Sequence, residues 1–403
     1  MAGALWAHPL TEAGALPFSP LTAAALGVMG IVLFATLTHP PRAEGDDASE
    51  VEADPQSGSI REDGGDALGP ARLATRALAL IVFLLAIAVG RLGSAFELEN
   101  LAPVLLIGVA WPGVVIACAF LGRVWPWLDP FDTLARALGG LVGDREGGSR
   151  DVLWAAFPAL AWTWYLSAYP SSLTPRTVGA VAALYTIVVV AACLAWGRRR
   201  VLERAEPFGI FYGLVGGFRA ESRTWTPPRN ADVLLAILLG GVLFGGLRQS
   251  TLWGALNASP RAGTLAAAGL LLVSALSVTF VWMAGRGRAG RRATVAVALV
   301  PVTAAAVVAV SMARNRLTTS AQLLPELLTH PFGDDIATLE LLRSLDPNPL
   351  GTTGRTVLQM SLLVVGGIVG AVVVRRRYGT AANPAVAAVC VFTAVAVVAV
   401  SAV

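Results

Sequence analysis

Apolar stretches of about twenty residues recur along this chain, and they constrain its fold more than any other feature. A helix of that length crosses a bilayer core of roughly 30 Å. Of the 403 residues, 55% are hydrophobic and 14% are charged, whereas soluble domains carry about 25% charged residues. The sequence therefore predicts an all-α, polytopic bundle of transmembrane helices, which forms a single membrane domain over residues 1–403 with the lipid bilayer as its partner.

About ten spans are expected, and the distribution of arginine orients them. They run roughly over 20–38, 74–91, 101–121, 153–169, 178–196, 231–247, 264–284, 293–312, 356–374 and 384–402. The loops on one side carry 22 of the 30 basic residues, all of which are arginine. Positive charge stays on the cytoplasmic side. We therefore expect a multi-pass protein of the cell membrane with both termini outside.

Two hydrophilic loops stand apart from the spans. Residues 40–70 hold nine acidic residues between Glu44 and Asp66 and almost nothing apolar, so we expect a disordered cytoplasmic loop. A docking strip for a basic partner is the alternative interpretation. Residues 313–354 form an outer loop whose leucines recur at helical spacing. This spacing predicts two short capping helices, one on Leu323 and Leu327 and one further along the loop.

The stretch GRVWPWLDPFDTLAR, residues 122–136, predicts a hinge between a crossing helix and an interfacial helix. Trp125 and Trp127 suit the headgroup level. Asp129 is placed to cap the next helix, because a proline follows it at the first helical position. Asp132 lies off the apolar face of that helix. We expect the helix to lie on the inner leaflet surface, with its charged side toward water.

The same arrangement recurs at Glu206-Pro207-Phe208, again on the arginine-rich side. It predicts a second interfacial helix. A gate or a partner site at these hinges is the alternative to a purely structural role.

The expected spans contain almost no titratable side chains. No Asp, Glu or His lies in the middle of a span, and the three cysteines fall inside apolar runs. A site inside a bilayer usually depends on such residues, so the sequence points to no cofactor, no metal and no proton relay. No polar loop combines a basic stripe with aromatic residues, so nucleic acid is not an expected partner.

Two features of the spans suggest how they pack. Gly241 and Gly245, and likewise Gly366 and Gly370, have the spacing that lets helices approach closely. A proline in the middle of the third span predicts a kink beside an indole ring. The candidate residues for a cavity or gate are therefore Trp111, Pro112, Trp125, Trp127 and Asp129.

Several phrases occur in one order along the chain: AHPLTEAGALPFSP, NLAPVLLIGVAWPGVVIACAFLGRVWPWLDPFDTLAR, AEPFGIFYGL, LFGGLRQSTLW, LVP from Leu299, and THPFG. Together they resemble a prokaryotic family of multi-pass membrane proteins known as fenitrothion hydrolases. The resemblance covers most of the chain as separate motifs. It implies a membrane component of an organophosphate-hydrolysing system that works with a second protein.

The chain departs from the family pattern at four positions. Where the family has an Asp, this chain has Gly245; where it has three histidines, this chain has Val310, Gly367 and Arg375. Metal-assisted hydrolysis needs such ligands around an activated water. The residues that match are His8 and Gln322, and with the outer-loop histidine they give a candidate site on the outer face: His8, Gln322 and His330.

Three functions remain open from the sequence. The first is a non-catalytic membrane subunit or scaffold that binds a partner protein, which suits spans without charge. The second is a transporter of a neutral or hydrophobic small molecule. The third is a membrane component of an organophosphate hydrolase system. The missing ligands favour a non-catalytic role over an enzymatic one.

Overall fold

The computed structural model describes residues 69–139, 151–220, 225–248, 250–285, 289–313, 316–332 and 350–401. Within these ranges the helices are joined by turns and short irregular segments, and an isolated bridge between Asp151 and Arg229 is the sole β-type pairing. The first expected span, the acidic loop and the second half of the outer loop lie outside the described residues. The prediction of an all-α fold is confirmed for the part of the chain that is described.

Six stretches are long and apolar enough to cross a membrane. They are α2 (Pro70–Leu92), Pro103–Leu121 formed by η2 (Pro103–Ala110) and α3 (Trp111–Leu121), α7 (Pro175–Trp196), α12 (Ala262–Ala284), Gly290–Ala313 within α13 (Ala289–Ala313), and Gly351–Val400, which holds α16 (Gly351–Tyr378) and α17 (Asn383–Ser401). These stretches support a membrane protein.

The expected number of ten spans is not confirmed. Two of the expected spans are short helices, α6 (Ala156–Ser167) with 12 residues and α10 (Ala231–Leu247) with 17. At 1.5 Å per residue, α6 is about 18 Å long, which is less than a bilayer core. The sequence pattern located both segments, and α10 has the expected bounds, whereas α6 is shorter than the apolar segment that contains it.

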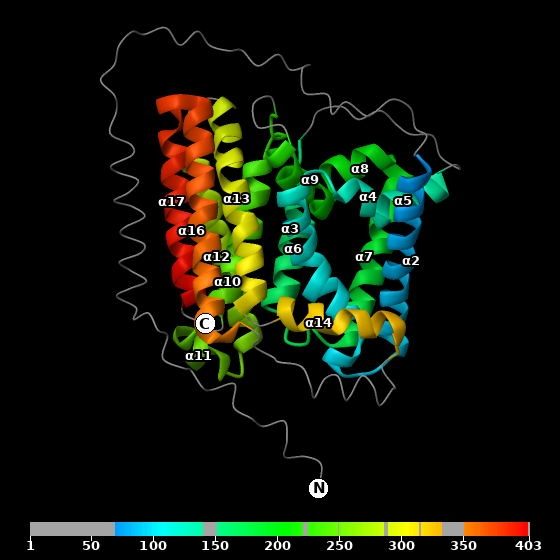
Figure 1. Cartoon of the computed structure of the whole chain (residues 1–403). Helices are drawn as coiled ribbons and strands as arrows, with labels where there is room; N and C mark the ends of the chain where they lie inside the picture. Colours follow the sequence, from blue (N-terminus) through cyan, green and yellow to red (C-terminus); the bar gives the residue numbers. More distant parts are fainter. Residues whose placement is uncertain are drawn as a thin grey trace.

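The helices form two groups that meet in the middle of the molecule (Figure 1). One group contains α10, α12, α13, α16 and α17; the other contains α2, α7 and the shorter α5 (Pro130–Gly139) and α8 (Arg198–Arg204). Between them lie α3, α6 and α9 (Pro207–Ala220), with α3 packed on α9 and α13, and α6 packed on α10. The deepest core belongs to α13, since 78% of its candidate span is buried.

Different short helices cover the two ends of the bundle (Figure 1). At one end, here named the α14 end, α14 (Arg316–Thr329) lies across the longer helices. Leu323 and Leu327 of α14 are fully buried in a cluster with α2 and η2 residues, and they are the leucines from which the first capping helix was predicted. At the other end, named the α8 end, lie α4 (Trp125–Leu128), α5 and α8.

The glycine pair of α16 brings two helices into close contact, as the sequence predicted. A Cβ added to Gly370 of α16 would lie 2.5 Å from the carbonyl oxygen of Ala298, and one added to Gly366 would lie 2.9 Å from that of Pro301. Contacts this short leave no room for a side chain. The two glycines, which lack a side chain, therefore allow α16 to pack closely on α13.

Candidate functional site

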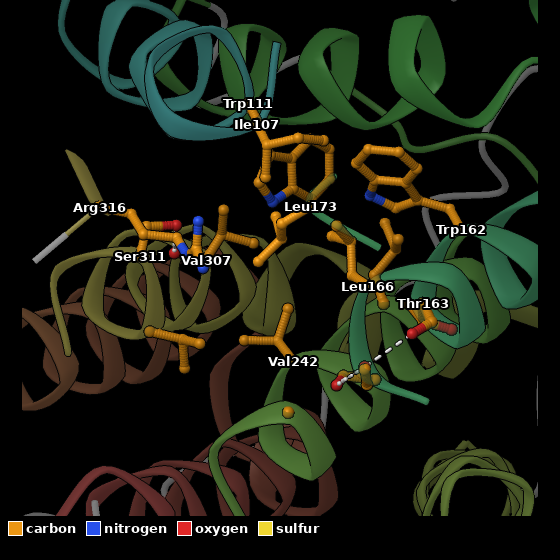
Figure 2. A pocket seen from close by; sticks show the side chains of 15 residues that line it. Ile107, Trp111, Trp162, Thr163, Leu166, Leu173, Val242, Val307, Ser311 and Arg316 are labelled. Atoms are coloured by element: carbon orange, nitrogen blue, oxygen red, sulfur yellow. Dashed lines mark hydrogen bonds between the residues drawn. The ribbon is translucent and has the colours of Figure 1, made fainter. Parts of the chain in front are cut away.

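A cavity of about 80 Å³ lies between α6, α10, α13 and the η2–α3 helix, where the two helix groups meet (Figure 2). Its lining is mostly apolar, with hydroxyl groups from serine and threonine and the guanidinium of Arg316. Arg316 begins α14, whereas Trp111 lies near the middle of the Pro103–Leu121 stretch. The cavity therefore reaches from the α14 end toward the centre of the bundle.

Two glycines of α10 shape the wall of this cavity. Gly241 lies against Thr163 of α6, because a Cβ added to it would be 2.2 Å from the Thr163 Cγ2. A Cβ added to Gly245 would meet nothing closer than the Ser167 Oγ at 3.7 Å. Gly241 thus draws α6 and α10 together, and Gly245 leaves the space that becomes the cavity.

Aromatic rings line the inner end of the cavity. The Trp111 ring lies 5.7 Å from that of Trp162 and 5.5 Å from that of Phe208, in edge-on contacts. Trp111 stands where the π-helix η2 becomes the α-helix α3, with Pro112 buried beside it. A π-helix is a rare, wide turn that often occurs at functional sites. Trp111 and Pro112, both predicted to form a cavity or gate, are thus at the cavity or next to it.

At the opposite end of the cavity lies the guanidinium of Arg316, whose charge is partly neutralised by a carboxylate. The Arg316 Nη1 forms an ion pair with Glu97, while the Arg316 Nε is buried without a hydrogen-bond partner. Ser311, near the end of α13, lies beside it in the lining. This end of the cavity therefore offers an unused N–H donor and little net charge, which suits a ligand with a neutral acceptor group.

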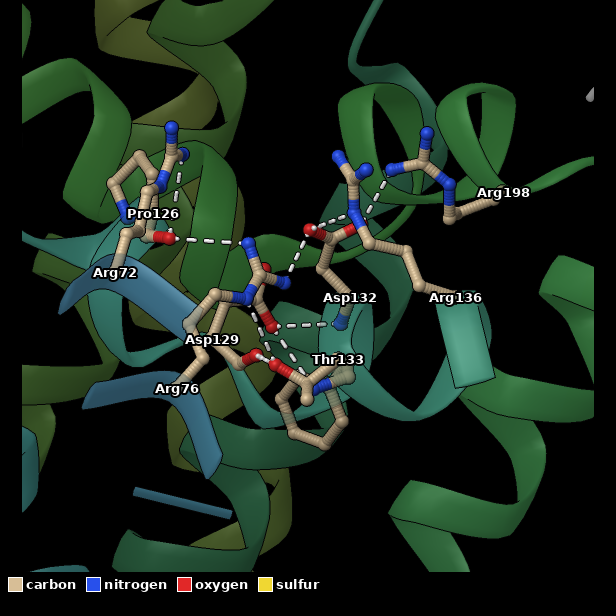
Figure 3. A network of polar contacts seen from close by, with 9 residues as sticks. Arg72, Arg76, Pro126, Asp129, Asp132, Thr133, Arg136 and Arg198 are labelled. Atoms are coloured by element: carbon tan, nitrogen blue, oxygen red, sulfur yellow. Dashed lines mark hydrogen bonds and ion pairs between the residues drawn. The ribbon is translucent and has the colours of Figure 1, made fainter. Parts of the chain in front are cut away.

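A separate polar cluster lies at the α8 end, centred on Asp132 (Figure 3). Its carboxylate forms ion pairs with Arg76 of α2, with Arg198 of α8 and, at 3.0 Å, with Arg136 of α5. Burial by itself would raise the pKa of Asp132, but the three guanidiniums outweigh it and the pKa is lowered. The ion pairs connect three helices through one carboxylate.

Asp129 caps its helix, as the sequence predicted, but it is buried near a second carboxylate, which the sequence did not indicate. Its Oδ1 accepts hydrogen bonds from the backbone N–H groups of Phe131 at 2.9 Å and Asp132 at 3.0 Å. The side chain is buried, and this burial, together with the charge of Glu206, raises the pKa of Asp129 to about 7. Asp129 and Asp132 are three residues apart, yet their pKa values move in opposite directions.

Glu206 is almost completely buried at the start of α9. Its Oε1 accepts a hydrogen bond from the Tyr185 hydroxyl at 2.7 Å and one from the Phe208 N–H at 3.1 Å. Its Oε2 accepts one from the Gly209 N–H. Burial raises the pKa of Glu206, although these three donors act in the opposite direction.

Two sequence expectations are wrong at this end. Asp132 was expected on the water-facing side of its helix, but it is 8% exposed and is enclosed by arginines. The helical interior was expected to lack titratable groups, but Glu206 reaches Tyr185 near the middle of α7. The cause is the same in both cases: short helices between the spans fold inward and bring carboxylates with them.

The remaining predicted residues are in different places. Trp127 is 44% exposed with the Arg72 guanidinium over its ring, while Trp125 packs on Tyr212 with ring centroids 4.7 Å apart. On α14, Gln322 donates to its own helix, to the Thr318 carbonyl oxygen.

The outer-face candidates are not shown to meet. His330 lies 3.0 Å from the Glu326 carboxylate, one helical turn earlier on α14. His8 lies outside the described residues. Among the described residues no group of three or more His, Cys, Asp and Glu side chains is placed to hold a metal ion.

Sequence reasoning missed Arg76, Tyr185 and Glu206 as partners in a cluster. The signal for Glu206 was present, because its Glu-Pro-Phe motif repeats the Asp-Pro-Phe motif at Asp129. Arg76 gave a weaker signal as an arginine just inside an apolar run. No local pattern in the sequence indicates that these residues come together.

Comparison with known proteins gives no relative: no family model, no curated protein and no solved structure matches this chain.

Proposed function

We propose that this protein is a membrane transporter for a neutral or hydrophobic small molecule, which it binds in the cavity between its two helix groups. The observation that carries this proposal is the position of the cavity. It extends inward from the α14 end and stops at the aromatic rings of Trp111 and Trp162. Sites between the helices of a bundle are common places for small ligands.

The chemistry of the lining favours a ligand without net charge. Aliphatic and aromatic side chains make up most of it, and the charge of Arg316 is offset by Glu97. The hydroxyls and the Arg316 Nε supply a small number of polar contacts, which orient a ligand in an apolar site. In this proposal the rings of Trp111, Trp162 and Phe208 act as the gate that separates the cavity from the α8 end.

Binding is tested with fenitrothion, a neutral nitroaromatic ester, added to the protein in proteoliposomes. We expect it to quench tryptophan fluorescence, since two indoles line the cavity. The variant Gly245→Leu fills the cavity and is expected to weaken binding at least tenfold. The matched control is Gly213→Leu, because a Cβ at Gly213 meets nothing within 4 Å. Equal quenching in both variants and in protein-free liposomes would refute binding in the cavity.

Transport is tested separately, by the flux of neutral solutes into the same liposomes. Removal of the central ring in Trp111→Ala is expected to raise the flux, since it opens the aromatic barrier. A chain that binds the probe but moves no solute in either form would be a binding protein rather than a transporter.

The resemblance to fenitrothion hydrolases supports a second proposal, organophosphate binding without hydrolysis. Two positions at which that family has metal-binding side chains, Gly245 and Val310, line the cavity. A third, Gly367, instead lies against Thr393 of α17. We expect no nitrophenol release from fenitrothion, with or without added Zn²⁺ or Mn²⁺. Release of nitrophenol that depends on added metal would instead support a hydrolase.

A role as a scaffold for a second protein remains a prediction. Co-purification of a fixed partner from mild detergent supports it, and a chain that is always isolated alone opposes it.

A further inference from the structure

The first turn of α9 lies inside the bundle. The Phe208 ring is 5.5 Å from the rings of both Trp111 and Tyr185, which are near the midpoints of their candidate spans. Two turns later, a Cβ at Gly216 would lie 2.7 Å from the carbonyl oxygen of Gly122, which follows the end of α3. α9 therefore begins deep in the bundle and runs toward the α8 end, and Glu206 stands at its deep end.

Polar groups converge on the Glu206 carboxylate from three segments. Tyr185 of α7 and two backbone N–H groups of α9 donate to it. A Cβ on Gly209 would lie 2.8 Å from the Glu206 Oε2 and 3.0 Å from the Trp125 Nε1. The Trp125 Nε1 is buried and has no hydrogen-bond partner. An indole N–H thus lies beside the carboxylate without being used.

The arginines nearby are committed to a different carboxylate. Arg76 and Arg198 form ion pairs with Asp132, and within the described residues no ion pair of this cluster ends on Asp129 or Glu206. Arg76 and Asp132 also act on Asp129, and their charges have opposite effects on it. The other titratable groups that face the pair are Tyr185, Tyr212 and Cys193. One ring pair joins the two carboxylates: the Phe131 N–H donates to Asp129, the Tyr185 hydroxyl donates to Glu206, and the two rings lie 5.3 Å apart. Both carboxylates are buried in this region, and neither forms an ion pair there with a described residue.

We propose that Asp129 and Glu206 form a shared proton-binding site, which exchanges one proton with water at the α8 end. A proton from water adds to one carboxylate oxygen, and the charge of the pair changes from −2 to −1 with no other bond made or broken. Like charges in one buried site disfavour ionisation of both groups. The direction of the pKa shift at both residues agrees, since burial raises each.

The position of the site connects it to the cavity. Phe208 is two residues from Glu206, and its ring lies 5.0 Å from Trp162 and 5.5 Å from Trp111. Both indoles line the cavity. A change of charge at the start of α9 therefore acts next to the rings that end the cavity. The proton site itself does not depend on the cavity holding a ligand.

The test is infrared titration of the full-length protein in detergent, following the C=O absorption of a protonated carboxyl group. We expect one such band to disappear as the pH rises through about 7, the pKa of Asp129. Asp129→Asn should abolish this transition while keeping the helix cap, since asparagine caps as well as aspartate. The control Glu99→Gln, in the loop before η2, should leave it unchanged.

A second variant separates proton sharing from a structural role. Glu206→Gln removes the neighbouring negative charge, so the Asp129 transition should shift to lower pH. If Glu206 had only a structural role, Glu206→Gln would change the stability of the protein but would leave the pH midpoint of the Asp129 titration unchanged. The proposal fails if no carboxyl band titrates between about pH 5 and pH 9, or if Glu206→Gln leaves the midpoint where it was.

Discussion

At the scale of single residues, the surroundings decide what each carboxylate does. Asp129 and Asp132 begin the same helix and are both buried. Asp132 has three guanidiniums around it and stays ionised, whereas Asp129 has Glu206 as its charged neighbour and its pKa rises to about 7. One residue type thus provides a fixed anion and a titratable group within a single turn.

Removal of the fixed anion should be costly. Asp132→Asn leaves Arg76, whose side chain is 1% exposed, without its charged partner. Breaking a buried ion pair from one side costs about 3–5 kcal/mol, so the thermal unfolding midpoint in detergent should fall sharply. Arg136→Gln is the control, because that side chain is 29% exposed and such pairs contribute about 1 kcal/mol or less. Equal losses in the two variants would contradict a central role for Asp132.

Stability should depend on pH through Asp129. Its pKa is raised in the folded state, so its contribution is full below the unfolded pKa of about 4 and is lost as the pH rises through about 7. The unfolding midpoint should therefore be lower at pH 8 than at pH 5, and Asp129→Asn should reduce the difference. Asp132 has the opposite sign, because its lowered pKa makes its contribution disappear only in acid. If the unfolding midpoint rises from pH 5 to pH 8 in the unsubstituted protein and not in Asp129→Asn, the raised pKa of Asp129 is contradicted.

At the scale of elements, small residues and inward-folding short helices organise the bundle. α13 and α16 approach closely because glycines face the α13 backbone. α5 and α9 begin with an acidic residue and a proline, which fix where each helix starts. Their first turns carry Asp132 and Phe208 into the bundle, where ion pairs and ring contacts hold them.

The glycine contact gives a prediction for α16. Gly370→Ala places a Cβ 2.5 Å from the Ala298 carbonyl oxygen, so the helices must move apart, at a cost of about 1–3 kcal/mol. Gly354→Ala makes the same change on the same helix, but its nearest neighbour is the Leu350 Cβ at 3.7 Å. It should be neutral or stabilise by up to about 1 kcal/mol, because alanine is the better helix former. Unfolding midpoints of the two variants measure the difference, and equal midpoints would contradict close packing.

At the scale of the whole molecule, two groups of helices meet around a cavity, and each end has its own short helices (Figure 1). The α8 end carries Arg76, Arg136 and Arg198, together with the first residues of α2 and the last of α7. α16 ends in three consecutive arginines, Arg375, Arg376 and Arg377. This arginine-rich end is the one that we predict to face the cytoplasm.

Orientation is tested with single cysteines on α16. Cys118, Cys193 and Cys390 are first replaced by alanine, and Thr352→Cys and Arg376→Cys then mark the two ends of the helix. Both positions are exposed. A membrane-impermeant maleimide should label Thr352→Cys in intact cells and should label Arg376→Cys only after the membrane is opened. The reverse pattern would invert the orientation, and labelling of both from outside would mean that α16 does not cross.

Much of the architecture could be predicted from local patterns. Apolar runs located the long helices, and Asp129 was assigned its capping role from the proline that follows it. The pairs at Gly366 and Gly370 predicted close packing. The bounds of α10 agree with the expected span, whereas the length of α6 was overestimated, since composition does not determine where backbone hydrogen bonding stops.

The candidate sites could not be assembled in the same way. Arg76 and Asp132 are 56 residues apart, and Tyr185 and Glu206 are 21 residues apart, so no period in the sequence relates them. The cavity depends on Trp111, Trp162 and Gly245, which come from three helices. Trp111 was identified as a candidate from its proline neighbour. The residues around it, Trp162 and Phe208, come from other helices and are brought there only by helix packing.

By itself, the sequence determined that this chain is helical and apolar enough for a membrane, because helix length and hydrophobicity are local properties. The tertiary structure alone decided that carboxylates lie among the helices and that a cavity lies where the two groups meet. Those features depend on contacts between distant segments, and their energies arise only once packing has removed water from around Asp132 and Glu206.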